Sequence, residues 1–373
     1  MNHWFIQNIN IVNEGVCFKG SILIEDGYIA EIFPENASYN IPQGIPIIEG
    51  NDNYLLPGII DIHVHFREPG LTHKGDMSTE SSAAAAGGVT SICEMPNTNP
   101  PTISKELLSN KYQCASESSI TNYAFYPGAT NHNIEWLLQI NPCDIPGVKV
   151  FLGASTGDLL LEDSAVFEML LQKSNLPVMV HAEDNDIIHR NIELFSGKYN
   201  GIIPPREHIN IRSRESCMKA SEYAIETACR YQSRLHLLHV TTREECVLIQ
   251  HEKVKNKFLT AEACTGHLFF NEHHYNTLGN LIKVNPSIKC TSDQKALTEA
   301  VRNNHLDLIA TDHAPHLYDE KQRDYLDAPS GMPLIQHSLN AMIEYYFQGV
   351  FSLEQIVQKM CHAPADILKI NNR

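Results

Sequence analysis

The chain has 373 residues, of which 43% are hydrophobic, and carries a formal net charge of -16 at pH 7. This length accommodates one large α/β domain with a small additional domain, and the acidic charge argues against binding to nucleic acid or anionic membranes. The sequence has no apolar run long enough to cross a bilayer, begins without the features of a signal peptide, and has ten cysteines without a CxxC pair. We therefore expect a reduced, cytoplasmic protein whose partner is a small molecule.

The first fifty residues are predicted to form short β-strands. Residues 21–33 contain two alternating apolar runs on either side of the Glu25-Asp26-Gly27 turn, a pattern typical of a β-hairpin. The Pro57-Gly58 pair then marks a change of organisation. The expected divisions are a small β domain at 1–54, a larger domain at 55–350 and a C-terminal helical segment at 351–373.

From Gly58 onward, apolar runs of strand length alternate with segments of helical periodicity. The eight strand-like runs are 58–66, 89–95, 122–127, 147–152, 177–181, 234–239, 258–263 and 306–310. Helical spacing of apolar residues is found between them, for example at 78–86, 164–172 and 215–230. This alternation predicts an α/β fold of the (β/α)8 TIM-barrel type. A doubly wound open sheet is the alternative, because short strands are easily miscounted in a sequence.

Polar residues gather where the predicted strands end, which is where a β/α barrel places its catalytic groups. Asp61, His63, His65 and Arg67 alternate along the first run, so they share one face of the strand. A His-x-His pair on one face directs two imidazoles at one point, as the ligands of a divalent metal require. A solvated polar strand end is the alternative interpretation.

Two further histidines close apolar runs. His181 ends the fifth run and His239 ends the sixth. Each by itself is typical of a structural histidine, but at equivalent ends of barrel strands the two favour a shared metal site. His236 is out of phase with His239, and we interpret it as structural.

Asp312 and Lys149 complete the set of candidate ligands. Asp312 follows the eighth run, where a carboxylate can ligate a metal and act as a general base; a helix N-cap is the alternative. Lys149 lies inside the fourth apolar run, where a charged amine is costly. It is either a snorkelling edge lysine or a neutral amine that can react with carbon dioxide to give a carbamate ligand. With the four histidines, these residues would supply two metal coordination spheres, suited to amide hydrolysis.

Several motifs resemble, in chain order, the signatures of dihydroorotases of the amidohydrolase superfamily. They are LPGIIDIHVHFREPG at 56–70, MPNTNP at 95–100, VHAE at 180–183, HVT at 239–241, TAE at 260–262, VNP at 284–286 and IATDHAPH at 309–316. The first and last motifs are specific to this family. The short motifs are weak individually and support the resemblance only because they occur in the same order along the chain. The resemblance implies the reversible cyclisation of N-carbamoyl-L-aspartate to L-dihydroorotate in pyrimidine biosynthesis.

The resemblance also implies a role for each candidate residue. It implies two zinc ions per chain, with a hydroxide and carboxylated Lys149 bridging them. One zinc would be held by His63, His65 and Asp312, and the other by His181 and His239. Asp312 would be the catalytic proton carrier. The substrate-binding residues that it implies are Arg67, Asn97, Asn285 and His316. Arginine suits a carboxylate because its guanidinium donates two parallel hydrogen bonds.

Two rival functions are weighed against dihydroorotase. Allantoinases and hydantoinases share the metal site but typically lack counterparts of Arg67 and Asn97, so dihydroorotase is favoured. An inactive chain that serves as a structural companion of aspartate transcarbamoylase is disfavoured, because every expected ligand position is filled. Some relatives use an aspartate where others use the carboxylated lysine, and Asp158 and Asp163 are the weaker candidates for that role.

The C-terminal segment departs from the resemblance. Relatives usually continue with a β segment that completes a small β-sandwich with the N-terminal strands, and 351–373 contains no such segment. The N-terminal part is therefore expected to be an incomplete sandwich with an exposed strand edge. Candidate partners are a second copy of the chain and aspartate transcarbamoylase.

Overall fold

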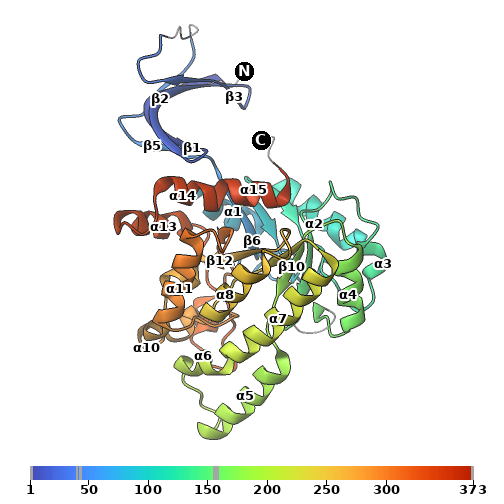
Figure 1. Ribbon diagram of the computed structural model, residues 1–373. Helices are drawn as coiled ribbons and strands as arrows, with labels where there is room; N and C mark the ends of the chain where they lie inside the picture. The colour runs from blue at the N-terminus through green and yellow to red at the C-terminus, as the bar shows by residue number, and fades with distance from the viewer. Residues whose placement is uncertain (1–2, 39–40, 42–43, 154–158, 371–373) are drawn as a thin grey trace.

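The computed structural model describes residues 3–38, 41, 44–153 and 159–370. These residues form a β/α barrel with a smaller β-sheet beside it (Figure 1). Within the described ranges, no helix combines the length and the apolar character that a membrane span requires.

Eight parallel strands form the barrel in the described part of the chain. They are β6 (Ile59–Val64), β7 (Val89–Glu94), β8 (Asn122–Phe125), β9 (Val148–Phe151), β10 (Val178–His181), β11 (Leu235–Leu237), β12 (Thr260–Cys264) and β13 (Leu308–Ala310). Continuous pairing gives two arcs, one from β6 to β8 and one from β9 to β13. Parallel bridges join the arcs, at Gly128 with Lys149 and at Val64 with His313. The ring is closed, so the predicted (β/α)8 barrel is confirmed and the open sheet is excluded.

The helices lie around the outside of the strands (Figure 1). They are α1 (Met77–Ala86), α2 (Lys105–Ser118), α3 (Ile134–Leu137), α4 (Ser164–Lys173), α5 (Asn185–Lys198), α6 (His208–Ile211), α7 (Arg214–Tyr231), α8 (Arg243–Glu252), α9 (Thr265–Phe269), α10 (Tyr275–Leu278), α11 (Thr291–Arg302), α12 (Tyr318–Lys321), α13 (Ser338–Phe347), α14 (Leu353–Val357) and α15 (Ala363–Leu368). Shorter turns are the 3-10 segments Pro205–Glu207, Glu272–His274 and Gly279–Ile282 and the π segment Gln358–His362. Side chains such as Ser104 and Ser213 cap the first turn of a long helix by accepting a backbone N–H.

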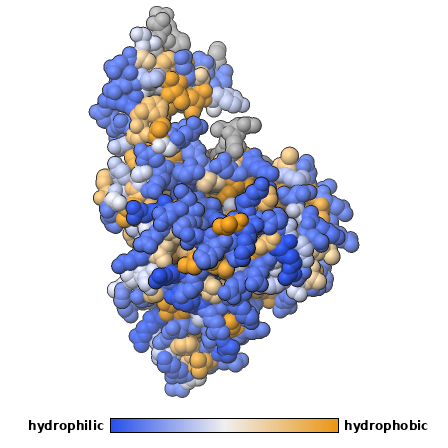
Figure 2. All heavy atoms as spheres, in the orientation of Figure 1, coloured by the Kyte–Doolittle hydropathy of each residue, from blue (hydrophilic) through white to orange (hydrophobic). Residues whose placement is uncertain are grey.

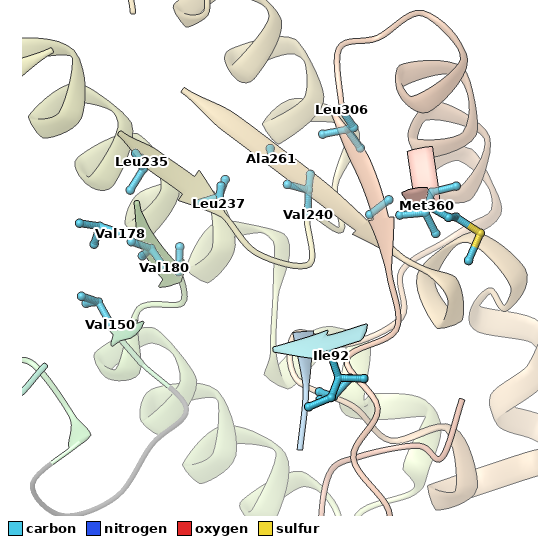
Figure 3. Packing of buried hydrophobic residues seen from close by; sticks show 14 of the residues in the cluster. Ile92, Val150, Val178, Val180, Leu235, Leu237, Val240, Ala261, Leu306 and Met360 are labelled. Carbon is cyan, nitrogen blue, oxygen red and sulfur yellow. The ribbon is translucent and has the colours of Figure 1, made fainter. Parts of the chain in front are cut away.

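Alternation along the strands separates the core from the site. On β10, Val178 and Val180 pack into the large apolar cluster (Figure 3). The same cluster includes Leu170 of α4 and Ala224 of α7. The intervening Met179 is paired in register with Lys149 of β9. Because successive side chains of a strand point to opposite faces, Met179 and Lys149 point into the barrel.

The N-terminal residues form a separate mixed sheet. Its strands are β1 (His3–Asn13), β2 (Val16–Glu25), β3 (Tyr28–Pro34), β4 (Ile47–Glu49) and β5 (Tyr54–Leu55). The order is β3-β2-β1-β4, with β5 also paired to β1, and the antiparallel β2–β3 pair is the predicted hairpin. Hydrophobic side chains gather on this sheet (Figure 2), and some of them, including Ile6 and Ile24, line a cavity of about 590 Å³ that Ile370 also borders.

The C-terminal helices cover the amino-terminal end of the barrel. Lys359 Nζ donates to the Leu306 carbonyl just before β13, at 2.7 Å. Arg234, just before β11, donates from Nη2 to the Ile367 carbonyl, also at 2.7 Å. One end of the barrel is thereby closed, and the opposite, carboxyl end remains for a site.

A buried ion pair ties α2 to the barrel. Lys111 Nζ lies 3.0 Å from Glu94 Oε2 at the end of β7, and both side chains are fully buried. Glu94 Oε1 also accepts the backbone N–H of Phe66 at 3.0 Å, so the pair supports the chain that leads to Arg67.

Replacing Lys111 by methionine is expected to destabilise the protein strongly. The substitution leaves the Glu94 carboxylate buried without its partner, which should lower the free energy of unfolding by about 3 to 5 kcal/mol. Urea denaturation followed by circular dichroism measures the change. Lys105→Met, on the exposed face of the same helix, is the control, with an expected change within about 0.5 kcal/mol. Equal stability of the two variants would contradict the role given to the buried pair.

Candidate active site

A polar cavity of about 100 Å³ lies at the carboxyl end of the barrel. Nine of the ten predicted site residues line it, namely His63, His65, Arg67, Asn97, Lys149, His181, His239, Asn285 and Asp312. The tenth, His316, lies next to two lining residues, with Nε2 at 2.9 Å from Arg67 Nη2 and 3.0 Å from the Ser330 carbonyl oxygen. The structure thus brings all ten candidates together, although they come from seven separate segments of the chain.

Asp312 faces the His-x-His pair of the first barrel strand. Its Oδ1 lies 3.2 Å from His63 Nε2 and 3.0 Å from His65 Nε2. Three side chains each offer one potential ligand atom, and these atoms lie within 4.8 Å of one another. The three residues are His63, His239 and Asp312. Burial raises the pKa of Asp312, but the facing imidazoles His63 and His65 outweigh it and bring the pKa to about 2. The carboxylate is therefore anionic at neutral pH.

The second pair of histidines meets in the same way. His181 Nδ1 lies 2.8 Å from His239 Nε2, and both rings are buried. Burial lowers the pKa of each, for His239 well below its usual value, and burial likewise brings the pKa of His65 to about 4. Neutral imidazoles with available lone pairs are the form in which histidine binds a metal.

Lys149 lines the same cavity as the four histidines and Asp312. Its side chain is 1% exposed, and its Nζ lies 4.4 Å from the centre of the Phe151 ring. Across the described ranges, no carboxylate forms an ion pair with it. Burial lowers the pKa of Lys149 to about 7 in spite of the opposing charge of Asp312. A substantial fraction of the amine is therefore unprotonated near neutral pH.

The two aspartates considered as alternatives to Lys149 for the shared metal ligand are Asp163 and Asp158. Asp163 caps α4, where its Oδ1 accepts the Ala165 N–H at 2.9 Å, and it does not border the cavity. Asp158 lies outside the described residues.

Two buried carboxylates support the histidines from behind. Glu262 accepts from His63 Nδ1 at 2.5 Å and from the His239 backbone N–H at 3.1 Å. Its other oxygen lies 3.1 Å from Nε2 of His236, which matches the structural role predicted for that histidine. Glu183 lies 2.9 Å from His181 Nε2. Both glutamates belong to motifs of the sequence, but the sequence predicted no role for them; the available signal was an acid within or just after an apolar strand.

These observations fit a metal-binding site. The donors are buried imidazole nitrogens and a partly buried carboxylate, and burial lowers the pKa of His65, His181 and His239. Carboxylates hold the outer nitrogens of His63 and His181, which is the support that metal-ligating histidines usually have. The buried His239 Nδ1 has no hydrogen-bond partner in the described part of the chain.

One cation and two side-chain amides also line the cavity. Arg67 is 7% exposed, and its Nε donates to the Pro315 carbonyl at 3.0 Å. Within the residues that the structure describes, no carboxylate pairs with it. Asn285 Oδ1 is buried without a hydrogen-bond partner there, and Asn97 Oδ1 lies 2.7 Å from His65 Nδ1. An anionic ligand would satisfy the guanidinium.

Comparisons with known proteins agree with this geometry. A model described as "Amidohydrolase family" matches residues 54–373, and the closed barrel with buried metal donors is of that class. The dihydroorotase of Methanosarcina acetivorans is 30% identical over 369 residues, covering 96% of this chain and 77% of the relative. That of Bacillus cytotoxicus is 29% identical, covering 98% and 84%. The chain therefore belongs to the amidohydrolase family and, within it, to the dihydroorotases.

Solved structures support the fold. L-hydantoinase from Arthrobacter aurescens superposes with a TM-score of 0.92 at 23% identity, covering all of this chain and 83% of the other. Dihydropyrimidinase from Brevibacillus agri gives a TM-score of 0.89 at 22% identity, covering 99% and 82%. At these sequence identities the structural similarity establishes the architecture of the fold. The substrate has to be inferred from the residues that line the cavity.

Replacing Glu262 by glutamine is expected to weaken zinc binding. The substitution removes the charge that supports His63 and the His239 backbone, and the affinity should fall about 10- to 100-fold. Competition with a chromophoric chelator measures the affinity. Glu222→Gln, on the exposed face of α7, is the control. An unchanged affinity in the Glu262 variant would show that this carboxylate does not support the ligands.

Proposed function

We propose that this chain is a dihydroorotase, a cyclic amidohydrolase that interconverts L-dihydroorotate and N-carbamoyl-L-aspartate. The proposal depends on Arg67, whose buried guanidinium lines the same cavity as the candidate metal-binding residues. This guanidinium has no carboxylate partner among the described residues. L-dihydroorotate is a cyclic amide with a carboxylate beside the ring, so it presents an anion to Arg67 and an amide to the metal donors.

The residues that would hold zinc form two groups. His63, His65 and Asp312 meet on one side, and His181 and His239 meet on the other. Lys149 lines the same cavity, and as a carbamate it would add an anionic ligand shared by two zinc ions. The low pKa of its buried amine supports this modification, because only the unprotonated amine reacts with carbon dioxide. When bound, zinc polarises the amide carbonyl and lowers the pKa of water.

Asp312 would carry the proton of the reaction. Its carboxylate is anionic and is oriented by His63 and His65, so it can accept a proton from the attacking water. Delivery of that proton to the ring nitrogen would allow the amide bond to break. In the biosynthetic direction the same steps run in reverse, and Asp312 first takes a proton from the carbamoyl nitrogen.

The remaining residues would orient the substrate. Arg67 would hold its carboxylate with two parallel hydrogen bonds, aided by His316. Asn97 lies against His65, close enough to the ligands to contact the carboxylate or the ring. The unpartnered amide oxygen of Asn285 would accept from a ring N–H.

Turnover of competing substrates tests the proposal. The zinc-loaded protein should hydrolyse L-dihydroorotate at mildly alkaline pH, and it should turn over hydantoin and allantoin far more slowly, since these neutral rings leave Arg67 unpaired. Faster turnover of a neutral ring would overturn the assignment in favour of a hydantoinase or an allantoinase. No turnover of any cyclic amide, with zinc bound, would favour an inactive companion chain.

Replacing Asp312 by asparagine is expected to reduce kcat by about 10²- to 10⁴-fold, because the amide cannot carry the proton. KM for dihydroorotate should change little, since Arg67 is intact. Steady-state kinetics with a parallel zinc analysis measures both quantities and separates loss of the base from loss of metal. Asp319→Asn, exposed on α12, is the control. Near-normal kcat in the Asp312 variant would contradict its role as proton carrier.

A further inference from the structure

The imidazole of His316 contacts three polar groups beside the cavity. Its Nε2 lies 2.9 Å from Arg67 Nη2 and 3.0 Å from the Ser330 carbonyl oxygen. Its Nδ1 lies 3.1 Å from Lys74 Nζ. Burial, followed by the charges of Arg67 and Lys74, lowers the pKa of His316 to about 2. The ring is therefore neutral and carries a single N–H, on one nitrogen or the other.

The three contacts favour one of the two tautomers. An ammonium and a guanidinium can only donate, and a carbonyl can only accept. With the hydrogen on Nε2, the ring accepts from Lys74 and donates to Ser330, and only the contact with Arg67 brings two donors together. With the hydrogen on Nδ1, the ring accepts from Arg67, but it opposes a donor at Lys74 and an acceptor at Ser330. The Nε2–H tautomer forms two of the three bonds, and the alternative forms one.

Lys74 decides between these states. Without its ammonium, each tautomer would form one bond and leave one mismatch. Glu320 would then favour the reverse tautomer, because its Oε2 lies 3.6 Å from His316 Nδ1 and could accept a hydrogen there. In the present structure Glu320 Oε2 lies 3.4 Å from Lys74 Nζ and helps to keep the ammonium beside the ring.

The backbone of Gly331 keeps the ring in place. This residue has φ +148, and a Cβ built on it would lie 2.9 Å from His316 Cδ2 and 2.4 Å from the Ala314 carbonyl oxygen. His316 is thus packed against a main chain that has no room for a side chain. Since Nε2 carries either the hydrogen or a lone pair, the tautomer determines what Nε2 offers to its neighbours.

We propose that Lys74 is a positioning residue of the substrate-binding site, which holds His316 in the Nε2–H tautomer. The hydrogen on Nε2, which the Ser330 carbonyl accepts, can then be shared with an anionic group that Arg67 also binds. His316 Nε2 and Arg67 Nη2 are 2.9 Å apart, and an oxygen bound by both removes the donor–donor mismatch. The proposal rests on the proposed function in that this anion is the substrate carboxylate.

Kinetics of Lys74 variants provides the first test. Lys74→Met should raise KM for L-dihydroorotate by about 10- to 100-fold, as expected for a lost hydrogen bond to a charged group, with kcat within about threefold. Lys74→Arg retains a donor and should restore most of the affinity. Lys295→Met, exposed on α11, is the matched control and should match the wild type. An unchanged KM in Lys74→Met, or a fall in kcat alone, would overturn the proposal.

Nitrogen NMR of histidine-labelled protein provides the second test, and it needs no turnover. The ring signals of His316 are identified by their loss in His316→Gln. The wild type should show the hydrogen on Nε2, and Lys74→Met should move population to Nδ1–H. An unchanged tautomer overturns the proposal whatever the substrate is. A shift of tautomer in a protein that does not turn over dihydroorotate would support the role of Lys74 and overturn the proposed function instead.

Discussion

The closure of the barrel between its first and last strands is the constraint on which the site depends. Val64 bridges to His313, and the His65 N–H donates to the His313 carbonyl at 2.7 Å. This pairing sets Asp312 beside His63 and His65, about 250 residues away in the sequence. The second junction, at Gly128 and Lys149, orients the lysine inward in the same way. An open sheet of the same strands would leave these groups apart.

Burial then determines the chemical state of the groups that closure has assembled. It lowers the pKa values of His65, His181 and His239, and it brings that of Lys149 to about 7, so four nitrogens become available as ligands or nucleophiles. Asp312 stays anionic because imidazoles face it. Arg67, His239 and Asp312 also adopt positive φ angles of 70°, 37° and 50°. For residues other than glycine such angles cost about 1–3 kcal/mol each, which the surrounding barrel must offset.

Basic side chains gather around His316 although the chain as a whole is acidic. The chain carries a net charge of -16, yet Arg67, Lys74 and Lys321 lie near His316, with Glu320 as the neighbouring anion. Lys321 donates to the carbonyls of Lys283, Pro329 and Gly331, so its side chain also fixes the segment that borders the cavity. These basic side chains suit a substrate that is itself an anion. The acidic residues elsewhere on the surface are too far from the buried cavity to offset this local positive charge.

The sequence by itself determined the strands and the barrel, and it identified the residues that are candidate ligands. Eight apolar runs bounded by turn residues predict strands by periodicity alone, and His63, His65, His181 and His239 are recognisable because they interrupt or end such runs. The role of Lys74 was not predictable, because it lies in a turn and contacts His316 across about 240 residues. The hydrogen bonds of buried Glu262 were not predictable either, because they depend on which neighbouring strands place their side chains on the same side of the barrel. Periodicity and residue type are local properties that the chain carries in any conformation, whereas partners, burial and hence pKa and tautomer arise only when distant segments exclude water together.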